Sequence, residues 1–190
     1  MQAALKPKLQ ETQRYTYADY CTWGDDERWE LIDGIPYAMS PSPTRTHQKI
    51  VGNIYSRLEH FLRGKSCEVY ISPFDVRLNP GTKDDTVVQP DIVVVCDKSK
   101  LNDSGCVGAP DMVVEVLSPS TARRDRWLKF TRYIKAGVRE YWIVDPETKT
   151  ASVHILIDGA YTANAYSDED TVPVFVLDGC KINMGEVFGE

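Results

Sequence analysis

The spacing of apolar residues along the chain predicts two long amphipathic helices. From about Thr44 to Arg63 the apolar residues recur at intervals of three and four, which places them on one face of a helix. A second segment of this kind runs from Ser118 to Gly137, and its residues Trp127, Phe130 and Ile134 are expected to form the buried face. Each helix therefore has one face that must pack against another element.

Short segments rich in β-branched residues predict the strands. The segments 91–95 and 111–117 are almost continuously apolar, which is typical of buried strands. Turn signals at Asp33-Gly34 and Asp158-Gly159 predict two hairpins. The other expected elements are a short helix at 15–23 and strands at 28–32, 35–39, 68–72, 74–78, 140–144, 150–157 and 160–166. This succession predicts an α/β fold with a mixed central β-sheet, flanking helices and additional β-hairpins.

Length and composition indicate a single globular domain. The 190 residues are 42% hydrophobic and 26% charged, which fits one domain with a sizeable core. We assign residues 1–14 to a flexible N-terminal tail and residues 15–190 to one domain. No apolar segment is long enough to span a membrane, and the N-terminus lacks a signal-peptide core. We therefore expect a cytoplasmic protein with no membrane partner.

The cysteines indicate no special chemistry. They are scattered, odd in number and form no Cys-x-x-Cys pair, so the sequence predicts neither a zinc site nor a disulfide framework. Cys96 continues the alternation of a strand and is expected in the core. The five positions are Cys21, Cys67, Cys96, Cys106 and Cys180.

The charge distribution permits only a local contact with nucleic acid. A net charge of −6 argues against a protein that coats nucleic acid through bulk charge. One stretch is nevertheless basic, and it is either a solvated helix face or a phosphate-binding surface. Its residues are Arg123, Arg124, Arg126, Lys129, Arg132, Lys135 and Arg139.

Two acids lie in the apolar strands, where unpaired charge is costly. Asp91 begins the first of them and Glu115 lies near the end of the second. If the strands pair antiparallel, both acids meet at one edge of the sheet, where a divalent cation would compensate their charge. The alternatives are a turn acid at Asp91 and an arginine-paired acid at Glu115. Asp111 lies at the far end of its strand and is interpreted as structural.

Hydrolysis of a phosphodiester fits such a pair of acids. A metal ion stabilises the developing charge and generates hydroxide from water, and a nearby basic group places the water or stabilises the leaving oxygen. Pro90-Asp91 followed by an acid on the next strand resembles the PD-(D/E)XK nuclease motif. In the standard motif a lysine follows two positions after the second acid, but that position here is Leu117.

The chain resembles, over roughly residues 17–157, the Uma-two family of bacterial restriction endonucleases with a PD-(D/E)XK core. The segments that carry the resemblance are Glu30 to Gly34, Pro90 to Val94, Glu115 to Thr121 and Gly137 to Asp145. The resemblance implies a restriction-endonuclease-like core, Mg²⁺ (or Mn²⁺) held by Asp91 and Glu115, and DNA as the substrate. It also implies that Lys129 on the following helix, one turn before Tyr133, replaces the missing lysine. Alternatively, Lys129 is a solvated lysine at the boundary of the helix.

Five further residues are candidates for the site. Glu30 is either a third catalytic acid or a partner in a cross-strand salt bridge. Gln89 precedes the Pro-Asp pair and could hold a metal-bound water or a phosphate. His47 lies in the first turn of the long helix, where it is either a substrate contact or a structural group. Arg123 and Arg124, in the basic stretch, are expected to contact phosphates.

The leading hypothesis is a Mg²⁺-dependent endonuclease that cleaves DNA. A non-catalytic binding or assembly protein with a nuclease fold, and a metal-dependent hydrolase of small phosphate esters, are the alternatives. The segment 140–144, interpreted as an edge strand, and the C-terminal hairpin could support a homodimer.

Overall fold

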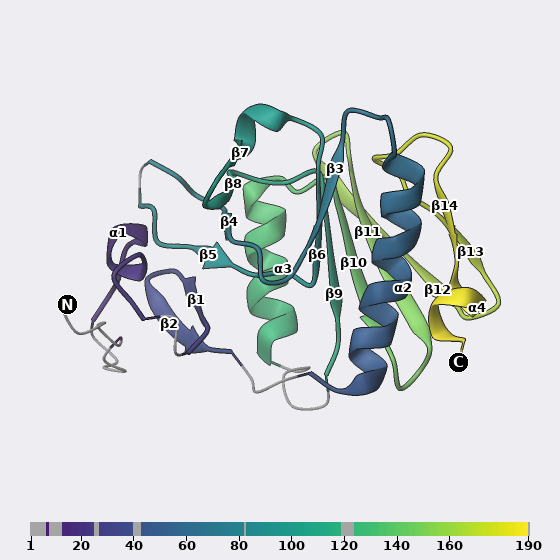
Figure 1. Ribbon diagram of the computed structural model, residues 1–190, viewed down its shortest axis with the longest axis horizontal. Helices are drawn as coiled ribbons and strands as arrows, with labels where there is room; N and C mark the ends of the chain where they lie inside the picture. Colours follow the sequence, from purple (N-terminus) through teal and green to yellow (C-terminus); the bar gives the residue numbers. More distant parts are fainter. Residues whose placement is uncertain are drawn as a thin grey trace.

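The computed structural model describes residues 7, 13–24, 27–39, 43–81, 83–118 and 124–189, with only the backbone for 124–126. The predicted N-terminal tail therefore lies almost entirely outside the described residues. The expected α/β fold with a mixed sheet and flanking helices is confirmed (Figure 1). No helix within these ranges is both long and apolar enough to cross a membrane.

The main sheet contains the two acidic strands at its centre. In order across the sheet, the strands are β12 (Ala160–Ser167), β11 (Thr150–Ile157), β10 (Glu140–Asp145), β9 (Met112–Val116), β6 (Ile92–Val95) and β3 (Glu68–Ile71). β9 and β10 pair parallel, whereas every other neighbouring pair is antiparallel. β6 is buried throughout, as its continuous apolar sequence predicts.

Helix α2 (Arg45–Leu62) covers one face of this sheet. Its buried residues include Ile50, Ile54 and Leu58, which pack on side chains of β6, β9 and β10 in one core. Thr44 caps the helix by accepting a hydrogen bond from the His47 backbone. The helix predicted for this segment is confirmed within one residue at each end.

Helix α3 (Arg124–Ala136) covers the opposite face (Figure 1). The expected burial of Trp127 is wrong, because its side chain is 75% exposed. The innermost residue is instead Tyr133, which is fully buried. The packed face of α3 is thus centred on Tyr133 and includes Lys129.

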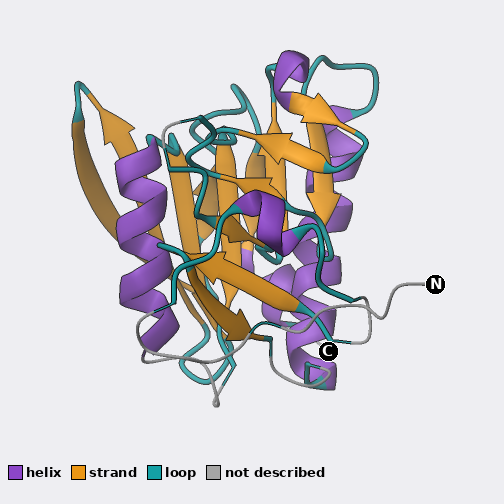
Figure 2. Ribbon diagram, turned by 90° about the vertical axis from the view of Figure 1, so that its left-hand side faces the viewer, coloured by secondary structure: helices purple, strands orange, loops and turns teal. Residues whose placement is uncertain are grey.

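A second sheet packs in the same core as α3, with its strands in front of those of the main sheet in Figure 2. Its order is β2 (Ile35–Ala38), β1 (Trp29–Ile32), β5 (Val87–Val88), β4 (Val76–Arg77), β8 (Gly105–Val107) and β7 (Leu101–Asn102). β1 and β2 form the predicted hairpin, with Asp33 and Gly34 at positive φ. This hairpin carries Glu30 into the interior.

The remaining elements are short. Thr16 and Asp19 form a capping box on α1 (Tyr17–Tyr20), within the expected N-terminal helix. The sequence did not predict η1 (Lys98–Lys100), β7 and β8, which form the connection between the acidic strands, nor the C-terminal β13 (Thr171–Pro173), β14 (Lys181–Asn183) and α4 (Met184–Phe188).

The expected edge position of segment 140–144 is wrong. β10 lies between β9 and β11, and β12 is the edge strand on that side. Glu140 is fully buried and accepts hydrogen bonds from Trp142 Nε1 (2.7 Å) and Val176 N (2.9 Å). This strand is therefore not available to pair with a second copy of the chain.

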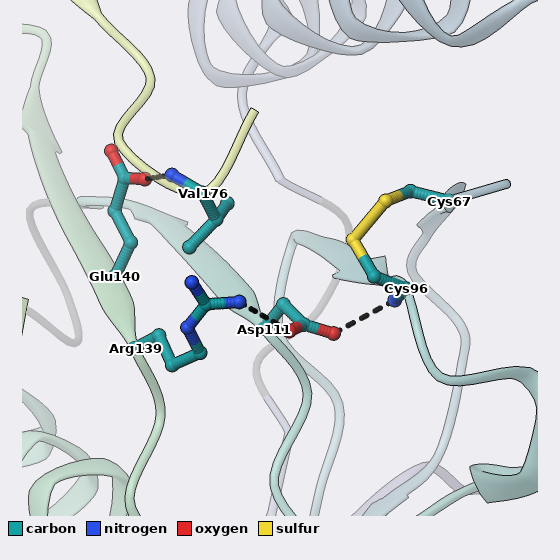
Figure 3. Close-up of a disulfide and its surroundings, with 6 residues drawn as sticks. All are labelled: Cys67, Cys96, Asp111, Arg139, Glu140 and Val176. Carbon is teal, nitrogen blue, oxygen red and sulfur yellow. Dashed lines mark hydrogen bonds and ion pairs between the residues drawn. A yellow bond between two sulfur atoms is a disulfide. The ribbon is translucent and has the colours of Figure 1, made fainter. Parts of the chain in front are cut away.

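Two cysteines form a disulfide, which corrects the expectation that none is bonded. Cys67 and Cys96 are bridged at the end of the β3–β6 pair (Figure 3). Because Glu68 pairs with Val95, the two cysteines occupy facing positions on adjacent strands. Asp111 accepts a hydrogen bond from Cys96 N (2.7 Å) and pairs with Arg139 (3.1 Å), which agrees with a structural role for Asp111.

Reduction of this disulfide is expected to lower the free energy of unfolding by about 3 kcal/mol, because it releases a loop closed across a sequence separation of 29. Urea denaturation with and without a thiol reductant measures the change. The Cys67→Ser, Cys96→Ser double variant should show the lower value in both conditions, and a wild-type chain insensitive to reductant would contradict the bridge.

Candidate active site

Asp91 and Glu115 stand opposite each other on neighbouring strands. β6 and β9 pair antiparallel with Ile92 opposite Val114, so the residue before Ile92 faces the residue after Val114. By alternation both side chains lie on the α3 face of the sheet. The two acids therefore lie at one end of the sheet, as the sequence led us to expect.

Glu115 is held by two donors from α3. Tyr133 Oη donates to its Oε1 at 2.7 Å, and Lys129 Nζ donates to the same oxygen at 3.1 Å. Burial raises the pKa of Glu115 to about 7 against the opposing charge of Lys129, and the charges of Asp91 and Glu30 add to the rise. Glu115 therefore keeps a proton more readily than an exposed glutamate does.

Lys129 bridges two acids from different sheets. Its Nζ lies 2.8 Å from Glu30 Oε1 and 3.1 Å from Glu115 Oε1, and its side chain is only 11% exposed. The interpretation of Lys129 as a solvated lysine is therefore wrong. Burial disfavours its charge, but the attraction of Glu115 and Glu30 outweighs burial and raises the pKa of Lys129. Lys129 is an ammonium group at neutral pH.

Glu30 reaches this point from the second sheet. Its Oε1 accepts a hydrogen bond from Gln89 N at 2.8 Å as well as the contact with Lys129. The structure thus brings Glu30 into the site instead of into a cross-strand salt bridge within its hairpin.

His47 extends the site from the first turn of α2. Its Nε2 lies 3.3 Å from Asp91 Oδ2, an oxygen that also accepts a hydrogen bond from Val116 N at 2.8 Å. Burial lowers the pKa of His47, but the hydrogen bond and charge of Asp91 outweigh burial, and the net shift is upward. His47 Nδ1 is buried and has no partner among the described residues.

The site holds more acids than lysines, and two carboxylate oxygens have no partner among the described residues. Contacts with described residues use only Oδ2 of Asp91 and only Oε1 of Glu115. The two side chains are 20% and 14% exposed, respectively. Since Lys129 contacts only two of the three carboxylates, Glu30 and Glu115, the site favours additional positive charge.

This donor set fits a magnesium ion. Within the described ranges no group of three or more His, Cys, Asp or Glu side chains could hold a metal. Mg²⁺ instead binds through one or two carboxylates and keeps several waters. Asp91 and Glu115 would hold Mg²⁺ or Mn²⁺ in this way.

Gln89 is occupied by its own network. Its Oε1 accepts hydrogen bonds from Arg28 Nη2 (2.6 Å) and Nε (3.1 Å), and its Nε2 donates to Asp75 Oδ1 (2.8 Å) and Tyr20 Oη (3.2 Å). Because these side chains use both the oxygen and the nitrogen of its amide, Gln89 is interpreted as an anchor for Arg28 and not as the predicted direct contact with a phosphate or water. Sequence reasoning did not single out Arg28, although it lies two residues before Glu30 and thus on the same face of the strand.

The basic stretch does not form a continuous surface in the described part of the chain. Arg132 pairs with Asp33, and Arg139 pairs with Asp111. Arg123 lies outside the described residues, and only the backbone of Arg124 is described. Of the members whose side chains are described, Lys129 is the one in the site.

Comparisons with known proteins agree with the fold. The family model Uma2, described as "Putative restriction endonuclease", matches residues 15–185. An uncharacterized protein of Synechocystis sp. is 32% identical over 117 residues, and the match spans 60% of each chain. The crystal structure of a protein described as a putative nuclease belonging to DUF820, from Anabaena variabilis, superposes with a TM-score of 0.75 at 18% identity, covering 92% of this chain and 97% of that chain.

Proposed function

Because the chain belongs to the Uma2 family, whose description is "Putative restriction endonuclease", we propose that it is a Mg²⁺-dependent endonuclease that hydrolyses phosphodiester bonds of DNA. The observation that carries this proposal is the position of the Lys129 ammonium group between Glu30 and Glu115, beside Asp91. Two acids that can hold a metal ion and one lysine-like group suit the hydrolysis of a phosphodiester.

Asp91 and Glu115 would be the metal ligands, and neighbouring groups would hold their carboxylates in place. Asp91 and Glu115 would hold Mg²⁺ through the oxygens that have no partner among the described residues, and the ion would supply a Lewis acid for the phosphate and lower the pKa of a bound water. Val116 N and Tyr133 Oη fix the orientation of the two carboxylates. His47 supports Asp91 from α2.

Lys129 would act as a fixed positive charge. Its raised pKa means that it cannot remove a proton from water at neutral pH in the arrangement described. An ammonium group held 2.8 Å from Glu30 can instead orient the attacking water and stabilise the negative charge that develops on the phosphate. Glu30 is therefore a positioning residue for Lys129.

Wild-type protein incubated with supercoiled plasmid tests the proposal. We expect nicked or linear DNA with Mg²⁺ or Mn²⁺ and none with EDTA, because the carboxylates alone cannot neutralise the developing charge. The same preparation should not hydrolyse p-nitrophenyl phosphate. Hydrolysis of that ester without DNA cleavage would favour the small-ester alternative, and inactivity on both substrates despite bound metal would contradict an enzymatic function.

A further inference from the structure

We propose that Arg28 forms an anchoring site for a second phosphate of the DNA strand, beside the phosphate that is cleaved. This inference rests on the proposed function and adds a substrate contact to it. Arg28 extends the β1–β2 hairpin, since its carbonyl accepts a hydrogen bond from Met39 N at 2.9 Å. Arg28 and Glu30 therefore lie on the same face of the strand, about 7 Å apart along it.

The guanidinium group is tied to segments that lie beside Asp91 and Glu30. Nη2 and Nε bind Gln89 Oε1, and Nη2 also donates to Ser72 Oγ at 2.7 Å. Gln89 is two residues before Asp91 and donates its backbone N–H to Glu30, and Ser72 N donates to the Asp91 carbonyl at 3.1 Å. The position of Arg28 relative to the acids is thus set by short, direct connections.

Gln89 is itself held rigidly. Both hydrogens of its Nε2 are used, one by Asp75 Oδ1 and one by Tyr20 Oη, and Tyr20 Oη donates to the same Asp75 oxygen at 3.1 Å. Two side chains from distant parts of the sequence, Tyr20 and Asp75, therefore fix the amide whose oxygen orients Arg28. Such preorganisation lowers the entropic cost of binding a ligand.

The Arg28 guanidinium group has N–H donors that no described residue uses and that a ligand could bind. Its contacts with described residues use Nε and Nη2 and leave both hydrogens of Nη1 without an acceptor. Arg28 is exposed and makes no ion pair with those residues, although its charge reaches the nearby Asp75, where it partly offsets the rise in pKa that burial causes. Arginine binds phosphate through parallel N–H donors. In a chain of net charge −6 with an acidic site, a cation at the rim offsets repulsion of the DNA backbone.

Arg28→Ala is the test, with Arg63→Ala as the matched control. Arg63 is also an exposed arginine, directly after the last residue of α2, whereas His47 is in the first turn of that helix. With Mg²⁺ and a short duplex, Arg28→Ala should raise KM about tenfold and leave kcat unchanged, because the contact is made equally in the ground and transition states. In a binding titration of the same duplex with Ca²⁺ in place of Mg²⁺, the slope of log Kd against log [Na⁺] should be smaller for Arg28→Ala than for the wild type by about 0.9, because one phosphate contact is lost. Arg28→Lys should recover part of the affinity.

Two results would overturn the inference. One is a KM and a salt slope for Arg28→Ala equal to those of Arg63→Ala. The other is a parallel loss of kcat and of Mn²⁺ affinity, measured by calorimetry, which would mean that Arg28 only maintains the geometry of the acids. If the wild type binds duplex without cutting it, the salt slope still tests Arg28 while the nuclease proposal fails. A wild type that does not bind duplex overturns both.

Discussion

The Lys129→Met variant is expected to lose Mg²⁺-dependent DNA cleavage by about a thousandfold. Methionine retains much of the length of the side chain but removes the charge that Glu30 and Glu115 hold in place. Without this charge, the proposed site loses the donor that would orient the attacking water. The measurement is the rate of plasmid nicking at saturating Mg²⁺.

Lys135→Met is the matched control, because Lys135 lies on the same helix but is exposed. It should cleave DNA at the wild-type rate. Lys129→Met should also be less stable by about 3 kcal/mol at neutral pH, since it leaves buried acids without their partner. Added Mg²⁺ should restore part of that loss in a thermal denaturation experiment. A Lys129→Met variant that folds and cleaves like Lys135→Met would contradict the role of Lys129.

The central pair of acids could be predicted because local sequence determines it. Two continuously apolar segments joined by a polar connection favour adjacent buried strands, and antiparallel pairing then fixes which ends meet. Asp91 and Glu115 consequently face each other although 24 positions separate them in the sequence. The β1–β2 hairpin was predictable for a similar reason, since Asp33-Gly34 sets its turn.

The face of α3 could not be predicted from its apolar residues alone. Periodicity treats a lysine as a polar residue that faces solvent, whereas Lys129 is buried because two carboxylates compensate its charge. Tyr133 is fully buried because its hydroxyl finds an acceptor in Glu115. The inward turn of these two residues places Trp127, two positions before Lys129, on the exposed side.

The Cys67–Cys96 bridge and the Arg28 network share a second reason for being missed. Each depends on the register of strands that do not follow one another in the chain: β3 with β6 for the cysteines, and β1 beside the segment before β6 for Arg28. Composition and spacing describe neither register. The polar groups that position the site are therefore visible only once the sheets are assembled.

Glu115→Gln is expected to weaken binding of Mn²⁺ by at least about a hundredfold at pH 8, because it removes one of the two carboxylates available to the ion. In the wild type, burial raises the pKa of Glu115 to about 7. In the folded protein the carboxyl group of Glu115 therefore stays protonated from the ordinary pKa range of a glutamate up to about pH 7. The ion must displace the proton. Affinity should therefore fall about tenfold for each pH unit below 7 and level off above it.

Calorimetric titration between pH 5.5 and 8.5, about the range that brackets the shifted Glu115 pKa, separates Glu115 from the other titrating groups. The Glu115→Gln variant should lose the pH dependence together with the affinity. Asp111→Asn is the matched control, since Asp111 precedes the same strand at its other end and pairs with Arg139; it should keep both. A pH dependence that persists in Glu115→Gln would assign the proton to another group near Asp91, such as His47, and would contradict Glu115 as the group whose ionisation limits metal binding.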